Sequence, residues 1–160
     1  MGVTMHEFTR YDSFAEIEAD FIDRVHSLVL CNCATVDTRG RPRSRILHPI
    51  WEGATGWVTT QKNTLKLKHL AQNPFVSLAY LGEPFKPVYV ECQAAWVDNL
   101  DERRRIWDLL RNTPEPLGFD PAITWGNVED PINGLLRLTP WRIELNDYTE
   151  EPAQTKIWKA

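Results

Sequence analysis

Hydrophobic and polar positions alternate in short runs along most of the chain, as in strands that bury one face. Gly, Pro, Asn and Asp lie between these runs and mark turns. The pattern predicts six strands, at residues 28–36, 42–51, 56–60, 75–80, 88–97 and 135–145. Residues 146–160 are polar except for Ile157 and Trp158, and we expect them to form a tail.

Three segments instead have the 3.6-residue spacing of a helix that buries one side. They are residues 13–27, 64–73 and 100–111. Ser13 and Glu16 have the spacing of a capping box at the first helix. Thr64 suits the N-cap of the second helix, for which the spacing predicts an apolar face of Leu67, Leu70 and Ala71.

Strands joined mostly by tight turns, with helices inserted between some of them, predict a mainly β fold of the α+β class. We expect one domain of residues 1–160, built as a six-stranded antiparallel barrel with peripheral helices. The N-terminal helix takes up residues 1–27, the barrel residues 28–145 and the tail residues 146–160. A parallel doubly wound sheet would need a crossover helix after most strands, and the spacing is too short for that. Residues 113–133 form a long loop, and loops of this length are usually functional or mobile.

Composition narrows the classes of function. The net charge is −4 and no long basic block occurs, which argues against general nucleic-acid binding. The chain has no apolar run near the roughly 20 residues that cross a bilayer and no signal-peptide pattern, so we expect a cytoplasmic protein. Cys31, Cys33 and Cys92 suit neither a disulfide framework nor a zinc site, and we expect buried reduced thiols. The four histidines show no metal-binding spacing, so no metal site is predicted.

Residues 59–80 carry the most informative functional pattern. Thr59 and Thr60 end a strand, a polar turn follows, and Thr64 precedes a short helix. Three amines surround the predicted helix N-terminus, those of Lys62, Lys66 and Lys68. Hydroxyls, amines and unpaired backbone N–H groups at a helix N-terminus can bind a phosphate monoester. The alternative is a solvated helix face rich in lysine.

Four segments, in this order, resemble the pyridoxamine 5′-phosphate oxidase-like, FMN-binding split-barrel family. They are ATVDTRGRPRSRIL at 34–47, WVTT at 57–60, the segment from Thr64 to NPFVSLAY at 64–80, and LRLTPWRIEL at 136–145. The resemblance covers roughly residues 28–145. It implies a split barrel, an FMN cofactor at the interface of a homodimer, and an oxidoreductase that acts on a small organic substrate by hydride transfer.

The resemblance also implies roles for single residues. Arg45, Thr64 and Lys66 would hold the FMN phosphate, with Lys62 or Lys68 as alternatives to Lys66. Further cofactor contacts are implied for Thr59 and Thr60 at the strand end, for Ile46 and Leu47 beside the isoalloxazine ring, and for Leu65 within the phosphate segment. His48 follows on the same strand and is a candidate contact to flavin or substrate, although a lone histidine more often has a structural hydrogen bond.

Departures from the family pattern bear on the substrate. Ile50 stands where true pyridoxamine phosphate oxidases have a lysine, and the substrate-phosphate trio of Tyr, Arg and Ser falls at Trp107, Arg111 and Glu115. The Arg-x-His element is absent near residues 146–148. We therefore expect a different substrate.

Two alternatives stay open for the function. One is an F420-dependent reductase of the same fold, whose basic groove could use Lys62, Lys68 and Arg43. The other is a flavin- or haem-binding module without turnover. Three tryptophans are candidate ring or interface contacts, at positions 125, 141 and 158.

Overall fold

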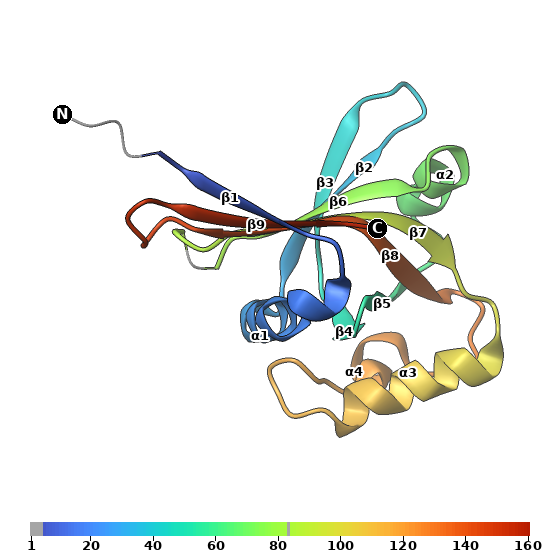
Figure 1. Cartoon of the computed structure of the whole chain (residues 1–160). Coiled ribbons are helices and arrows are strands. Elements are labelled where there is room, and N and C mark those ends of the chain that lie inside the picture. The colour runs from blue at the N-terminus through green and yellow to red at the C-terminus, as the bar shows by residue number, and fades with distance from the viewer. Residues whose placement is uncertain (1–4, 83) are drawn as a thin grey trace.

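The structure is a computed structural model, and it describes residues 5–82 and 84–160. Helices lie between groups of strands along the chain (Figure 1). The elements are β1 (Glu7–Tyr11), η1, a 3-10 turn (Phe14–Glu16), α1 (Glu18–Leu28), β2 (Cys31–Val36), β3 (Pro42–Leu47), β4 (Ile50–Glu52), β5 (Thr55–Gln61), α2 (Leu65–Gln72), β6 (Phe75–Tyr80), β7 (Val88–Trp96), α3 (Leu100–Asn112), α4 (Pro121–Trp125), β8 (Asn133–Asp147) and β9 (Gln154–Lys159). The fold is of the α+β class and mainly β, as predicted.

One large mixed sheet contains all of these strands. Its main order is β1-β9-β8-β7-β6-β2-β3, while β5 pairs with β8 and β4 pairs with β5. Every pairing is antiparallel except β1 with β9, which is parallel. The six predicted strands are present, but the predicted strand at 42–51 is divided into β3 and β4 by His48 and Pro49. The predicted strands pair with one another only in the antiparallel sense, as expected. The predicted number of six was too low, because β1 and β9 extend the sheet and one predicted strand is divided.

Strand β8 joins the parts of the sheet. It pairs with β7 along most of its length, with β5 over its first half, and with β9 over its second half. Pro140 lies between the two halves, opposite a register shift in β7 at Glu91 and Cys92. Proline has no N–H to give to a ladder, so it is tolerated at such an irregularity. The N-terminal half of β8 therefore positions β5, which precedes the candidate site.

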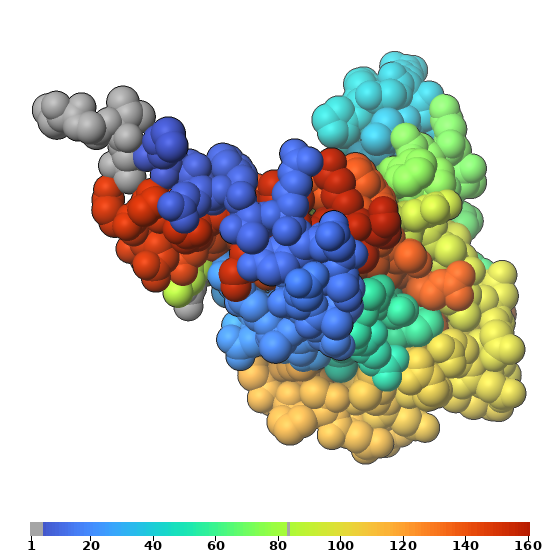
Figure 2. Space-filling model, viewed as in Figure 1, coloured from blue at the N-terminus to red at the C-terminus, as the bar shows by residue number. Residues whose placement is uncertain are grey.

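The ends of the described chain hold two strands that were not predicted. β1 and β9 lie side by side, and Figure 2 shows the blue N-terminal segment against the red C-terminal strand. Residues 146–160 are therefore not a simple tail: Thr155 and Trp158 are buried. The Trp158 ring packs 5.5 Å from Phe14, which places it in the core instead of at a ligand or an interface.

The helices α1 and α3 follow their predicted spacing closely. The backbone N–H of Ser13 donates to Glu16 Oε2 at 3.1 Å, and α1 buries Phe21 and Val25. α3 buries three side chains, Ile106, Trp107 and Leu110. The predicted loop at 113–133 contains α4. Within the described residues, no helix is both long and apolar enough to span a membrane.

Two hydrophobic clusters flank β5 and give it two buried faces. The larger cluster contains Val58 and all three cysteines, which are buried and free as expected. The smaller one contains Trp57 and lies between the β4–β5–β8 region and α3. Since successive residues of a strand point to opposite sides, β5 directs alternate side chains into different environments.

Candidate functional site

Arg45 of β3 and Lys66 of α2 come together although 21 positions separate them in the sequence. Arg45 pairs with Cys33 across β2, so both side chains lie on the inner face of the sheet. Lys66 is only 8% exposed. Burial lowers the pKa of Lys66, and the nearby Arg45 guanidinium lowers it further. Burial is also the main cause that lowers the pKa of Arg45.

The two cations have no carboxylate partner among the described residues. In residues 5–82 and 84–160, neither Arg45 nor Lys66 forms an ion pair with a carboxylate. The nearby Cys33 thiol stays neutral, because burial raises its pKa to about 11 although both cations lower it. Two partly desolvated positive charges without a counter-charge favour binding of an anion.

A short chain of hydrogen bonds anchors Arg45. Its Nη1 donates to Thr35 Oγ1 at 2.8 Å, and Thr35 Oγ1 lies 3.0 Å from His69 Nδ1. Thr35 comes from β2 and His69 from α2, so this chain also joins the helix to the sheet. The sequence interpretation did not include either residue. The sequence did contain a signal for both residues. His69 is three positions after Lys66 and so lies on the same side of the helix, and Thr35 is two positions after Cys33 and so lies on the same face of the strand.

α2 turns a different face inward from the one predicted. Its buried residues are Lys66, His69 and Leu70, whereas Leu67 and Ala71 are exposed. Thr64 occupies the N-cap position, but its hydroxyl donates to the Gln61 carbonyl at 3.5 Å and does not cap the helix. The helix therefore presents a lysine and a histidine to the sheet, where an apolar face was expected.

The other two lysines of the predicted cluster have different surroundings. Lys62 pairs with Asp98 and lies 5.8 Å from the centre of the Trp96 ring. Lys68 is exposed to solvent. Of the three lysines considered for the phosphate, only Lys66 is buried against Arg45.

The hydroxyls of Thr59 and Thr60 do not converge. Thr59 lines a cavity of about 10 Å³ next to Arg103 and Trp107 of α3. Thr60 lies on the opposite face of β5, the face of Val58, and is almost fully buried. The two side chains differ in direction because successive residues of a strand point to opposite sides. The cofactor contacts that the resemblance implies for Thr59 and Thr60 stay a prediction.

The apolar residues of the predicted set are also divided between two sides. Ile46 is 65% exposed and Leu65 is 55% exposed, while Leu47 is part of the larger core cluster.

His48 Nε2 donates to the Leu117 carbonyl at 2.6 Å, so His48 fixes the bend between β3 and β4 to the loop after α3.

The 113–133 segment is itself held by hydrogen bonds. Arg103 donates to the Val128 and Asn133 carbonyls, and the Asn133 side-chain amide donates to the Trp125 carbonyl. These bonds fix the segment to α3 and to the start of β8.

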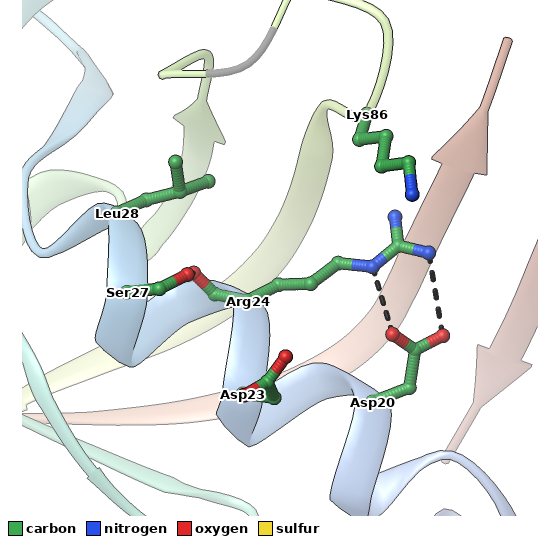
Figure 3. A pocket seen from close by; sticks show the side chains of 6 residues that line it. All are labelled: Asp20, Asp23, Arg24, Ser27, Leu28 and Lys86. Carbon is green, nitrogen blue, oxygen red and sulfur yellow. Dashed lines mark hydrogen bonds and ion pairs between the residues drawn. The ribbon is translucent and has the colours of Figure 1, made fainter. Parts of the chain in front are cut away.

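A second charged hollow, of about 190 Å³, lies between α1 and Lys86 (Figure 3). Its cations are already neutralised: Arg24 binds Asp20 with two hydrogen bonds, and Lys86 pairs with Asp147 at 3.3 Å. The contrast favours the Arg45–Lys66 pair as the anion site. In the part of the chain that the structure describes, no group of three His, Cys, Asp or Glu side chains is suited to a metal ion.

Comparisons with known proteins agree with the fold. A protein from Clostridium acetobutylicum, related to general stress protein 26 of B. subtilis (pyridoxinephosphate oxidase family), has a TM-score of 0.70 at 13% identity, covering 90% of this chain and 94% of that chain. A pyridoxamine 5′-phosphate oxidase-related, FMN-binding protein from Nostoc punctiforme has a TM-score of 0.65 at 15% identity, with 89% and 90% covered. The heme storage protein HutZ from Vibrio cholerae has a TM-score of 0.58 at 18% identity, with 78% and 89% covered.

At these identities, the solved structures show a shared fold. No curated protein sequence gave a significant match. The family model described as pyridoxamine 5′-phosphate oxidase matches residues 18–114, which is more than half of the 160 residues. This chain therefore belongs to the pyridoxamine 5′-phosphate oxidase-like, FMN-binding split-barrel family.

Proposed function

We propose that this chain binds FMN and acts as a flavin-dependent oxidoreductase that transfers a hydride to or from a small organic substrate. One observation carries the proposal: the buried Lys66 and the half-buried Arg45 lie together without a carboxylate partner among the described residues. A planar guanidinium and an ammonium together can neutralise a phosphate dianion, and the guanidinium can bind it with two parallel bonds. The Nostoc structure, an FMN-binding protein by its description, supports this choice of ligand.

The residues of the chain would bind and orient the cofactor. Arg45 and Lys66 hold its phosphate, and Thr64 at the start of α2 adds a hydroxyl. Ile46 and Leu65 offer exposed apolar surface next to these residues in the chain. The isoalloxazine ring supplies the redox chemistry when FMN is bound. His48 already donates to the Leu117 carbonyl, so its part in this proposal is to hold the loop.

The strand pairings support a split barrel as the scaffold of this site. They run from β5 through β8, β7, β6 and β2 to β3. The chain continues from β3 into β4, which pairs back with β5. We propose that this path closes the barrel and that the bend at His48 and Pro49 makes the closure possible.

The binding proposal is tested by titration with FMN. Replacing Arg45 or Lys66 with Ala removes a charge-assisted hydrogen bond, and each change should weaken FMN binding roughly 10- to 100-fold. Lys68→Ala is the matched control, because it removes a lysine of the same helix that is exposed. Unchanged FMN affinity in both site variants would refute the proposed site.

Turnover is tested separately from binding. The FMN-loaded protein should oxidise NAD(P)H in the presence of suitable acceptors. Binding of F420 without FMN would favour the F420-dependent reductase. Uptake of flavin or haem without turnover would favour a storage or sensing module. The likeness to HutZ, a heme storage protein, is the reason to include haem in the test.

The surroundings of three residues favour a substrate other than pyridoxamine phosphate. Ile50 and Trp107 are buried and apolar where family oxidases have a lysine and a tyrosine. Arg111 lies 3.6 Å from Asp120, which offsets its charge. A substrate phosphate would therefore find little positive charge here.

We also propose a homodimer. A groove of about 400 Å³ beside β2 and β6 is lined mainly by apolar residues, including Val36, Phe75 and Trp141. Phe75 and Trp141 are exposed, and large exposed apolar patches mark interaction sites. Light scattering should give a dimer, and Phe75→Glu should shift it towards monomer. A monomeric wild-type protein would refute the proposal.

A further inference from the structure

Thr35 and His69 form the inner wall of the cation site. Thr35 Oγ1 accepts a hydrogen bond from Arg45 and is 3.0 Å from His69 Nδ1. Thr35 is 2% exposed and His69 is 4% exposed. Water therefore competes little for these bonds, and each group depends on the next for its hydrogen bond.

The donors and acceptors of this chain run in one direction. A guanidinium can only donate, so the Thr35 oxygen accepts from Arg45. The described residues offer the single hydrogen of the Thr35 hydroxyl no other acceptor, so we assign His69 Nδ1 as the acceptor of this bond. His69 thus orients the Thr35 hydroxyl. Its hydrogen points away from Arg45, and a lone pair of its oxygen points towards the Arg45 guanidinium.

We propose that Thr35 and His69 are positioning residues for phosphate binding, because they hold the Arg45 guanidinium beside Lys66 with its other N–H donors directed at the anion. This inference rests on the proposed function, since the phosphate of FMN is the anion concerned. Lys66 repels Arg45 when no anion is bound, and Arg45 has many rotamers. Without the hydroxyl, phosphate binding must order the arginine again, which weakens affinity.

The test compares FMN with riboflavin, which lacks the phosphate. The dissociation constant of riboflavin divided by that of FMN isolates the contribution of the phosphate. Both constants are measured by quenching of flavin fluorescence. Thr35→Val keeps the shape and removes the hydrogen bonds, and it should reduce this ratio roughly three- to tenfold. Thr35→Ser keeps the hydroxyl and should retain the ratio. Riboflavin affinity should stay unchanged in both variants.

His69 has a matched pair of variants. His69→Leu removes the acceptor and should reduce the ratio as Thr35→Val does. His69→Asn can place its Oδ1 near the position of Nδ1 and should restore most of the ratio. Melting temperatures show that each variant is folded, and a merely structural role would lower FMN and riboflavin affinity together.

A double-mutant cycle decides whether Thr35 acts through Arg45. Thr35→Val should have no further effect on the ratio in an Arg45→Ala background. Additive effects, or an unchanged ratio in Thr35→Val alone, would overturn the inference while Arg45→Ala still weakens FMN binding. An Arg45→Ala variant with wild-type FMN affinity would overturn the proposed function and the inference with it.

Discussion

Replacing Lys66 with Met should make the protein without ligand more stable and its binding of FMN weaker. Methionine keeps an unbranched apolar side chain of similar length and removes the charge. Burial and the Arg45 charge lower the pKa of Lys66 in the folded state. The charged ammonium therefore destabilises the folded protein at neutral pH, where the same lysine in the unfolded chain is fully solvated.

The size of the effect follows from the structure and general magnitudes. Lys66 is 8% exposed and has no ion pair with a carboxylate among the described residues, so removing its charge should stabilise the fold by on the order of 0.5–2 kcal/mol. For a domain of this size each kcal/mol raises the melting temperature by about 2–4 °C. The expected rise is thus about 1–8 °C, together with a loss of roughly 10- to 100-fold in FMN affinity.

The assay is thermal unfolding of the wild type, Lys66→Met and Lys68→Met, each with and without FMN. Lys68→Met is the control because Lys68 is exposed on the same helix. At 100 times the dissociation constant, FMN should stabilise the wild type by about 2.7 kcal/mol. The advantage of Lys66→Met without ligand should shrink as the pH approaches the ordinary lysine pKa of about 10.4, because the ammonium is then lost in both states. A lower melting temperature for Lys66→Met than for Lys68→Met would refute the reasoning.

Three further changes test the scaffold. Tyr80→Phe removes the oxygen that accepts from Trp51 Nε1 at 2.9 Å in the core, and the orphaned donor should cost about 1–3 kcal/mol in chemical unfolding; an unchanged midpoint would show that the bond contributes nothing. Gly134→Ala would put its Cβ 2.4 Å from the Trp96 ring, and it should lower the melting temperature by the roughly 1–3 kcal/mol of an overpacked site, a prediction that wild-type stability would contradict. The pKa of Asp37 is lowered to about 2, chiefly by backbone N–H donors of its own turn, so its contribution to stability is present above pH 4 and is lost as the pH falls towards 2. Asp37→Asn should therefore be less stable than the wild type at neutral pH and should approach it near pH 2; a difference that does not depend on pH would argue against this origin.

Much of the fold could be predicted because its strands and helices bury regular faces. The alternation in β2 and the spacing of Phe21 and Val25 in α1 are unambiguous patterns. β1 was missed because its residues are exposed or half buried, so no alternation of apolar and polar positions marks it. β9 was missed because only two of its residues are large and apolar. Neither strand has a sequence pattern that identifies it, and each becomes recognisable only from its pairing in the folded sheet.

The candidate site was predicted only in part, because hydrophobic spacing does not show which polar residues are buried together. The order of motifs brought Arg45 and Lys66 into one hypothesis, and the structure places them together. The inward face of α2 was predicted incorrectly, because hydrophobic spacing assigns leucine to the interior and lysine to solvent. A buried lysine becomes understandable only when the arginine on a distant strand and the anion they can share are considered together.

The parallel pairing of β1 with β9 has a consequence for synthesis in the cell. Glu7 pairs with Gln154, and 147 positions separate them. A ribosome that adds about 5–20 residues per second needs roughly 7–30 s to synthesise that length of chain, and during this time β1 has no partner strand. The second half of β8 likewise presents an open edge until β9 emerges. A chain that stops before residue 154 would keep both edges exposed, and such edges recruit other chains. Truncated products of this gene should therefore aggregate instead of persisting as folded fragments.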